Sequence, residues 1–312
     1  MSEFGYNKLN EYLKEKYGER TLKICVDGGF TCPNRDGTKG YDGCIFCSSK
    51  GSGEHIEKFV KKSVGAFDNN ISNQIKAYFS SYRAGRANSF IVYFQNYSNT
   101  YDCIENLKIK YDSALIDERI RVLDIATRAD CIDEPICKLL STYKEKGIDV
   151  WVELGLQDAS DIIGKQINRC YLTEQVTNAV NLLNKYDIDC ILHIMVGLLN
   201  QKHEDIVKTV EYINSINYQG LKIHSTYVVE NTKLAQMYEN GEYQSMELDY
   251  YIKEVAYILT HINPNIVIHK LSGDAPKDML IVPEWNSHKK LIMNGIHKYL
   301  KENNLYQGMY YR

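Results

Sequence analysis

The sequence contains no apolar run long enough to span a bilayer, and its N-terminal segment lacks the apolar core of a signal peptide. It also lacks an excess of positive charge, because 37 Lys and Arg residues stand against 40 Asp and Glu residues. A generic nucleic-acid binder needs a basic field. These absences argue against a membrane protein, a secreted protein and a general RNA or DNA binder. We expect a cytoplasmic protein in which any RNA contact is a local patch.

No linker rich in Ser, Gly or Pro, no internal repeat and no low-complexity tract interrupts the 312 residues. The apolar share of 44% and the charged share of 25% are those of an ordinary globular protein. A chain of this length can form one large α/β domain with an extensive core. The nine cysteines, an odd number, do not resemble a secreted disulfide framework. We therefore expect reduced thiols.

Short apolar runs alternate with segments of helical periodicity along the chain. The runs predict strands at Thr21–Val26, 90–95, 122–127, 150–156, 190–196 and 221–228. Helical periodicity follows at 71–81, 135–146, 172–186 and 205–215, and a further helix at 6–17 precedes the first strand. Helices of this length between strands are typical of parallel crossovers, so the sequence predicts an α/β domain with a parallel sheet.

One face of most predicted strands is polar, which favours a barrel over an open sheet. Glu153 and Gln157 share a face of one strand, and Lys222 and His224 share a face of another. An open sheet buries both faces under apolar helices, whereas a barrel with a ligand inside accommodates polar side chains. We therefore predict a partial (β/α)6 barrel over residues 1–229. Residues 230–312 are expected to form an extension, with a candidate last strand at 265–271.

The segment 27–47, DGGFTCPNRDGTKGYDGCIFC, places Cys32, Cys44 and Cys47 in a C-x11-C-x2-C pattern. Its Gly, Pro, Asn and Asp residues favour turns, so it should be a loop. Three thiolates from one loop suit an iron–sulfur cluster that leaves one iron open to another ligand. A zinc site with Cys25 or His55 as a fourth ligand is the alternative.

This loop resembles the cluster-binding loop of the radical S-adenosylmethionine (radical SAM) enzymes. The common form of their motif is C-x3-C-x2-C, and the wider spacing resembles relatives of the Elongator catalytic subunit. The resemblance implies a partial-barrel fold, a [4Fe–4S] cluster on the three cysteines, S-adenosylmethionine (SAM) as second cofactor, and an electron donor such as flavodoxin or ferredoxin. Phe46 matches an aromatic residue that often shields the cluster in the family. Alternatively, Phe46 is an aromatic residue that serves only in packing.

Further segments carry the resemblance through most of the chain, among them QNYSNTY (95–101), VELGLQ (152–157) and KIHSTYVVENTKLAQMYENGEY (222–243). The cofactor-binding residues that the resemblance implies are Phe46, Gln95, Tyr97, Asn99, Thr100, Arg128, Glu153, Gln157, His193, Met195 and Gly197.

Several of these residues have plainer interpretations. Asn99 and Thr100 could cap the following helix, Arg128 could form a surface salt bridge, and His193 could be a satisfied core histidine. Glu153 is costly to bury alone, so we expect it to bind a ribose hydroxyl, an amine or Arg128.

Lys222, His224 and Cys170 are the candidate catalytic residues. Lys222 and His224 lie two residues apart on one strand face, where two cations repel each other unless an anion or a carboxylate lies between them. The anion could be a carboxylate or a phosphate of the substrate. Cys170 stands where many members of the family carry glycine, so it is either a second functional thiol or a neutral replacement.

The resemblance implies a radical SAM enzyme that modifies the C5 substituent of a tRNA wobble uridine. An expected basic helix at 287–303, with Lys289, Lys290, Lys298 and Lys301, would form part of the RNA footprint. Two alternatives remain open. One is a radical SAM enzyme that acts on a metabolite or peptide without RNA, and the other is a zinc-binding interaction module without catalysis.

Overall fold

The computed structural model describes residues 4–51, 56 and 70–312. Its main sheet has seven parallel strands in the order β1-β2-β3-β4-β5-β6-β8. The strands are β1 (Thr21–Val26), β2 (Ser89–Phe94), β3 (Ile120–Thr127), β4 (Asp149–Gln157), β5 (Asp189–Val196), β6 (Gly220–Ser225) and β8 (Val267–Lys270). Neighbours in sequence are therefore neighbours in the sheet, and all carboxyl ends lie at one edge.

Helices connect the strands and extend to the C-terminus. They are α1 (Leu9–Tyr17), α3 (Ile71–Phe79), α4 (Ile104–Asp112), α5 (Glu134–Glu145), α6 (Asp161–Gln166), α7 (Thr173–Lys185), α8 (His203–Asn214), α9 (Lys233–Glu239), α10 (Leu248–His261) and α11 (Lys289–Glu302). Two short strands, β7 (Val228–Val229) and β9 (Leu280–Val282), pair antiparallel outside the main sheet. Within the described ranges, no helix combines the length and apolarity needed to cross a membrane.

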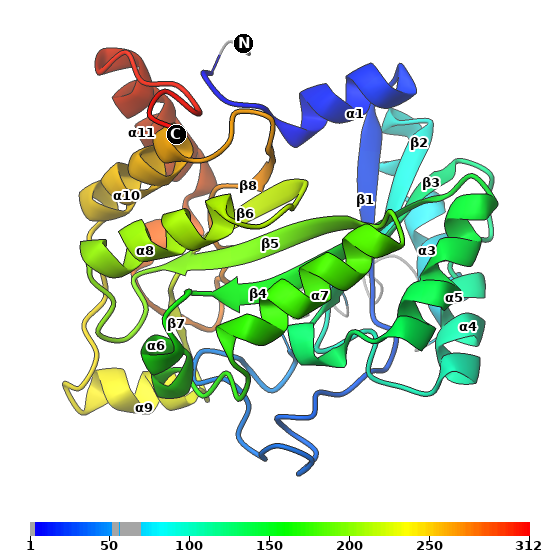
Figure 1. Cartoon of the computed structure of the whole chain (residues 1–312), viewed down its shortest axis with the longest axis horizontal. Coiled ribbons are helices and arrows are strands. Elements are labelled where there is room, and N and C mark those ends of the chain that lie inside the picture. Colours follow the sequence, from blue (N-terminus) through cyan, green and yellow to red (C-terminus); the bar gives the residue numbers. More distant parts are fainter. Residues whose placement is uncertain (1–3, 52–55, 57–69) are drawn as a thin grey trace.

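The sheet curls into a partial barrel. Figure 1 shows β1 running across the direction of β4 and β5, with α3, α4, α5, α7 and α8 on the outer side of the sheet. Outward-facing side chains such as Val92, Leu123, Val152, Leu192 and Ile223 are fully buried in the main hydrophobic core. The sequence prediction of an α/β partial barrel is confirmed, and the sheet has one strand more than the six in the predicted core.

The seventh strand comes from the predicted C-terminal extension. Val267–Lys270 pairs parallel with β6. Helix α10 precedes this strand and α11 follows it, and the two helices pack together on the same side of the molecule (Figure 1). The two chain ends lie together, since the Gln307 amide donates to the carbonyl oxygen of Gly5 at 2.7 Å. The division into a core of 1–229 and an extension of 230–312 stays a prediction.

Helix α1 closes the amino-terminal end of the barrel. Leu13 of α1 is 2% exposed and packs in one cluster with four inward-facing strand residues, Ile91, Val122, Trp151 and Ile191. The chain just before α1 is tied to the last strand, because the Ile268 amide donates to the carbonyl oxygen of Asn7 at 2.8 Å. The barrel interior is thus closed at this end and can receive ligands only from elsewhere.

We predict that Leu13→Ala lowers the free energy of unfolding by about 2–5 kcal/mol, because it leaves a cavity against the four strand residues. Leu291→Ala is the matched control, since Leu291 is 50% exposed and its loss should change stability by no more than about 0.5 kcal/mol. Urea denaturation followed by circular dichroism measures both. Equal effects for the two variants would show that α1 does not seal the barrel.

Candidate active site

A cavity of about 430 Å³ lies inside the barrel, and every strand of the main sheet contributes to its wall. Cys25 comes from β1, Tyr93 from β2, Glu153 from β4 and His269 from β8. The cysteine loop that follows β1 forms another part of the wall. Since the strands are parallel, their inward-facing polar residues meet in this one space.

Cys32, Cys44 and Cys47 all line this cavity, and none of the nine cysteines is in a disulfide. Burial, together with the neighbouring Cys47 thiol, raises the pKa of Cys44 to about 12, although Arg128 acts in the opposite direction. A buried thiol of this kind gives up its proton when a cation replaces it, so the site favours a positively charged, thiophilic group.

Contacts from distant parts of the chain hold the cysteine loop in place. Asn34 donates through Nδ2 to the carbonyl oxygen of Asn168 at 2.6 Å, and Asn168 donates back to that of Gly43 at 2.7 Å. Arg35 donates through Nη2 to the carbonyl oxygens of Cys47 and Ser48, both at 2.7 Å. The loop therefore keeps its shape without a regular secondary structure.

The donor set fits a [4Fe–4S] cluster, which takes one thiolate at each of three separate irons. A zinc ion instead needs its ligands around a single point. Among residues 4–51, 56 and 70–312, no three His, Cys, Asp or Glu side chains are grouped as a single-ion site. Of the fourth zinc ligands considered from the sequence, Cys25 lines the cavity, whereas His55 lies outside the described residues.

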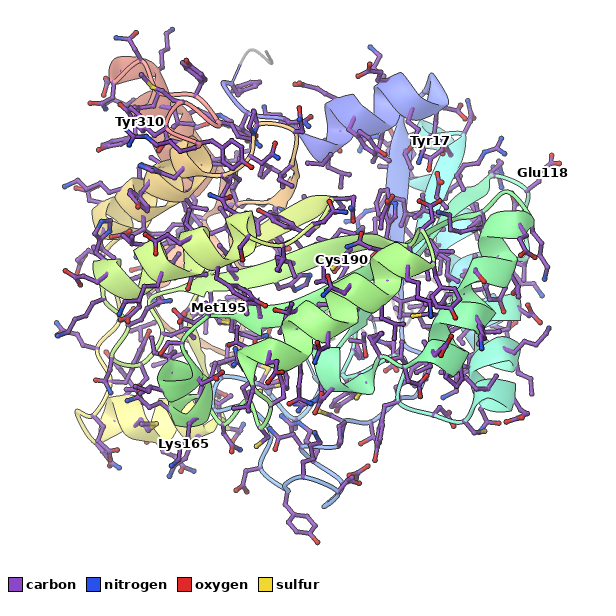
Figure 2. The ribbon with its side chains drawn as sticks, in the orientation of Figure 1. Tyr17, Glu118, Lys165, Cys190, Met195 and Tyr310 are labelled. Carbon is purple, nitrogen blue, oxygen red and sulfur yellow. The ribbon has the colours of Figure 1, made fainter. Side chains whose placement is uncertain are left out.

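Most of the residues predicted from the sequence meet in this cavity. Phe46 lies between two of the cysteines, and Met195 lies toward the carboxyl end of β5, farther along the strand than Cys190 (Figure 2). The other predicted residues that line it are Gln95, Tyr97, Arg128, Glu153, Gln157, His193, Lys222 and His224. The structure thus brings together ten predicted side chains other than the cysteines, from five strands or strand ends and the cysteine loop.

Asn99 and Thr100 do not line the cavity. Asn99 donates through Nδ2 to the carbonyl oxygens of Phe94 and Ala126, at 3.1 and 2.7 Å, and Thr100 donates to that of Cys131 at 2.6 Å. These bonds tie the carboxyl ends of β2 and β3 together. The capping alternative is wrong, because the residue that precedes α4 is Cys103.

Gly197 and Cys170 also lie outside the cavity wall. Both have a positive φ, a backbone conformation that favours glycine. Gly197 has a φ of 85°, and a Cβ there would lie 2.5 Å from Sδ of Met246. Cys170 has a φ of 61°, a left-handed conformation that glycine adopts with less strain. Its Sγ lies 3.2 Å from Oδ1 of Asn168, so the thiol faces the turn that anchors the cysteine loop.

Arg128 lines the cavity wall and has a protein partner, Asp130. Its Nε and Nη2 donate to the two carboxylate oxygens of Asp130 at 2.8 and 2.9 Å, a bidentate ion pair that is almost fully buried. The guanidinium also lies 4.7 Å from the ring centre of Tyr171. The expected bond between Arg128 and Glu153 is therefore wrong, and so is a surface position for the Arg128 salt bridge.

Glu153 is instead the centre of a buried charge network. One carboxylate oxygen accepts from Nζ of Lys222 at 2.5 Å and lies 2.8 Å from Nε2 of His193. The other accepts from Nζ of Lys23 at 3.4 Å, and Lys23 also donates to Asp124 at 2.6 Å. Of the partners expected for Glu153, the amine is the one present. The carboxylate expected near Lys222 and His224 belongs to the protein itself.

Burial and pairing together determine the charges of this network. Burial alone would raise the pKa of Glu153, but Lys222, Lys23 and His193 outweigh it and hold the pKa well below its usual value. Burial lowers the pKa of Lys222 to about 8, despite Glu153 beside it. Burial and the negative charge of Glu153 raise the pKa of Asp124 to about 7. Burial also lowers the pKa of His193, His224 and His269, so all three rings are neutral.

Several residues of the wall were missed as site residues in the sequence, among them Lys23, Tyr171 and Lys270. Lys23 interrupts the apolar run TLKICV at a position that faces inward, which was a usable signal. Tyr171 and Lys270 gave none, because Tyr171 comes from the connection between α6 and α7 and Lys270 from the end of a four-residue strand.

Two family models match the chain. One, described as the radical SAM superfamily, matches residues 31–213. The other, described as the Radical_SAM C-terminal domain, matches residues 218–302. Together they cover β2 to β6 and β8 of the main sheet, the three cysteines of the loop and the helices α10 and α11.

Relatives of similar length match almost from end to end. Protein YtqA of Bacillus subtilis is 32% identical over 98% of this chain and 93% of its own length. Protein MJ0486 of Methanocaldococcus jannaschii is 30% identical over 95% of this chain and 89% of its own.

Elongator complex protein 3 of Drosophila melanogaster matches only in part. It is 26% identical, over 51% of this chain and 28% of its own length.

Among solved structures, the archaeal Elp3 of Methanocaldococcus infernus, lacking its N-terminal residues, matches with a TM-score of 0.65. The sequence identity is 18%, so this match concerns the fold. The alignment covers 92% of this chain but 64% of the Elp3 chain, which therefore carries substantial structure beyond the matched region.

We predict that Glu153→Gln lowers the free energy of unfolding by about 3–5 kcal/mol, because it leaves Lys222 and Lys23 buried with too little negative charge. Glu302→Gln is the control, since the Glu302 carboxylate is 62% exposed and lies 3.9 Å from Lys298; its effect should stay within about 1 kcal/mol. Urea denaturation gives both values. Adding Lys222→Met to Glu153→Gln should recover part of the loss, and an additive further loss would rule out the pairing.

Proposed function

Because the chain belongs to the radical SAM superfamily, we propose that it is a radical SAM enzyme that modifies the C5 substituent of a tRNA wobble uridine. Cys32, Cys44 and Cys47 hold the [4Fe–4S] cluster, and SAM is the second cofactor. The observation that supports this most is that the three thiols and the polar strand-end side chains line one cavity. When bound, the cluster supplies the electron that cleaves SAM to a 5′-deoxyadenosyl radical.

The chain's own residues shape the cofactor side of the cavity. Phe46 packs with apolar neighbours of the loop and keeps water from the thiols on either side of it. Arg35 holds the carbonyl groups of Cys47 and Ser48, which orients the C-terminal end of the cysteine motif. Arg128, fixed by Asp130, presents a rigid positive charge close to Cys44. These residues orient and enclose the cofactors, which is what the protein contributes to the chemistry.

The tRNA part of the proposal rests on the resemblance to the Elongator catalytic subunit and on the charge of α11. Lys289, Lys290, Lys298 and Lys301 are all exposed on this helix, whose opposite face buries Ile292, Ile296 and Leu300. Lys289 also lines the cavity, so the basic face begins at the site. An electron donor such as flavodoxin or ferredoxin completes the set of partners.

We predict that protein reconstituted without oxygen contains about four irons per chain and that SAM changes the electron paramagnetic resonance spectrum of its reduced form. Cys44→Ala should lose the iron and the response to SAM, while its circular dichroism spectrum stays unchanged. Cys103→Ala is the matched control, because Cys103 is exposed and lies outside the cavity wall. Stoichiometric zinc, or a cluster that does not respond to SAM, would contradict the cofactor assignment.

We predict that tRNA binding weakens steeply with salt and that replacing Lys289, Lys290, Lys298 and Lys301 by Gln weakens it further. For each phosphate that a lysine no longer neutralises, the slope of log affinity against log salt should fall by about 0.7–0.9. Lys138→Gln with Lys185→Gln is the control, because both lysines are similarly exposed but lie on α5 and α7. Gel shifts at several salt concentrations measure this. No tRNA shift at low salt would favour a metabolite or peptide substrate.

A further inference from the structure

Each cation deep in the cavity has its own carboxylate. Lys222 pairs with Glu153 at 2.5 Å, and Lys23 pairs with Asp124 at 2.6 Å. Both carboxylate side chains are 0% exposed, and Lys23, Glu153 and Lys222 line the cavity. We call these two ion pairs the floor of the cavity. Two positive and two negative charges leave the floor with no net charge before any ligand enters.

The cations at the cavity mouth are not balanced in the same way. Lys270 and Lys289 both face Asp274, at 2.8 and 3.6 Å, so two lysines share one carboxylate. The Lys289 and Asp274 side chains are 62% and 46% exposed, which places this group at the mouth. Among the described residues of the cavity wall, the mouth therefore carries more positive than negative charge, and the floor does not.

The floor also offers uncharged hydrogen-bonding groups. Nε2 of His224 is buried and has no hydrogen-bond partner among the described residues, and the same holds for Nδ1 of His269. The His224 ring lies 5.0 Å from that of His193, and both rings line the cavity. Buried polar atoms of this kind are expected to be satisfied by something, and a ligand with neutral donors and acceptors would satisfy them.

We propose that the floor accepts only an uncharged, hydrogen-bonding ring and that the mouth accepts phosphate, so that a nucleotide enters base first. A carboxylate placed at the floor would lose its hydration without gaining a cation that is not already paired. A neutral nucleobase carries donors and acceptors that can pair with the histidine nitrogens. The phosphate of the same nucleotide remains near Lys270 and Lys289. This inference rests on the proposed function, and it adds that the C5 substituent reaching the floor is uncharged.

The test compares two anticodon stem–loop RNAs that differ only at the wobble uridine. One carries a 5-carbamoylmethyl group and the other a 5-carboxymethyl group, which are nearly equal in shape but differ by one negative charge. Affinities are measured by anaerobic calorimetry on the cluster-loaded protein at about pH 7.5, between the pKa of Asp124, about 7, and that of Lys222, about 8. The carbamoylmethyl RNA should bind at least about tenfold more tightly.

Variants separate the floor from the mouth. Glu153→Gln leaves Lys222 without its carboxylate, so the preference for the carbamoylmethyl RNA should disappear or reverse. Asp124→Asn removes the nearer carboxylate partner of Lys23 and should act in the same direction, which provides a second test if Glu153→Gln does not fold. Lys289→Gln changes the mouth alone and should weaken both RNAs by the same factor.

The outcomes distinguish this inference from the proposed function. A preference in the wild type that the floor variants abolish and Lys289→Gln preserves supports the inference. Equal binding of the two RNAs, or tighter binding of the carboxymethyl RNA, overturns the neutral floor while leaving tRNA as the substrate. Failure of both RNAs to bind overturns the tRNA substrate, and the inference falls with it.

Discussion

The carboxylate of Glu153 is the constraint around which the barrel interior is arranged. It accepts bonds from β1, β5 and β6 through Lys23, His193 and Lys222, so one side chain of β4 links four strands of the sheet. Beyond the apolar layer that packs against α1, the inner face of this half-barrel carries charged side chains, and charges buried there must neutralise one another. The network is therefore a structural requirement of a polar cavity as well as a candidate binding surface.

The cysteine loop depends on a different kind of support. Its own residues make turns, and its position comes from bonds to residues 167 and 168, more than a hundred positions later in the chain, and to the start of α9. The amide of Leu234, for example, donates to the carbonyl oxygen of Ile45 at 2.8 Å. Loop and barrel must fold together, because neither the thiols nor the strand ends alone define the cavity.

Sequence periodicity predicts the strands and their polar faces well, because a period of two determines which residues share a face. Glu153, Gln157, Lys222 and His224 were assigned to the interior in this way and do line the cavity. Which of the interior residues pair with one another could not be predicted from the sequence. Glu153 and Lys23 are 130 positions apart, and only the curl of the sheet brings them together. Asp130, two residues from Arg128, was a nearer partner than any cofactor and was overlooked.

The distribution of charge inside the cavity separates the binding of SAM from the binding of the substrate, which share one polar space. SAM carries its own positive and negative groups, and the thiols, Arg128 and Gln157 line the cavity beside the cysteine loop. If the floor also carried an unpaired cation, the carboxylate of SAM would have a competing site away from the cysteines. Pairing Lys222 with Glu153 and Lys23 with Asp124 removes that competition. The same pairing that allows lysines to be buried thus also directs an anionic group toward the cysteine side or the mouth, and leaves the floor to a neutral ring.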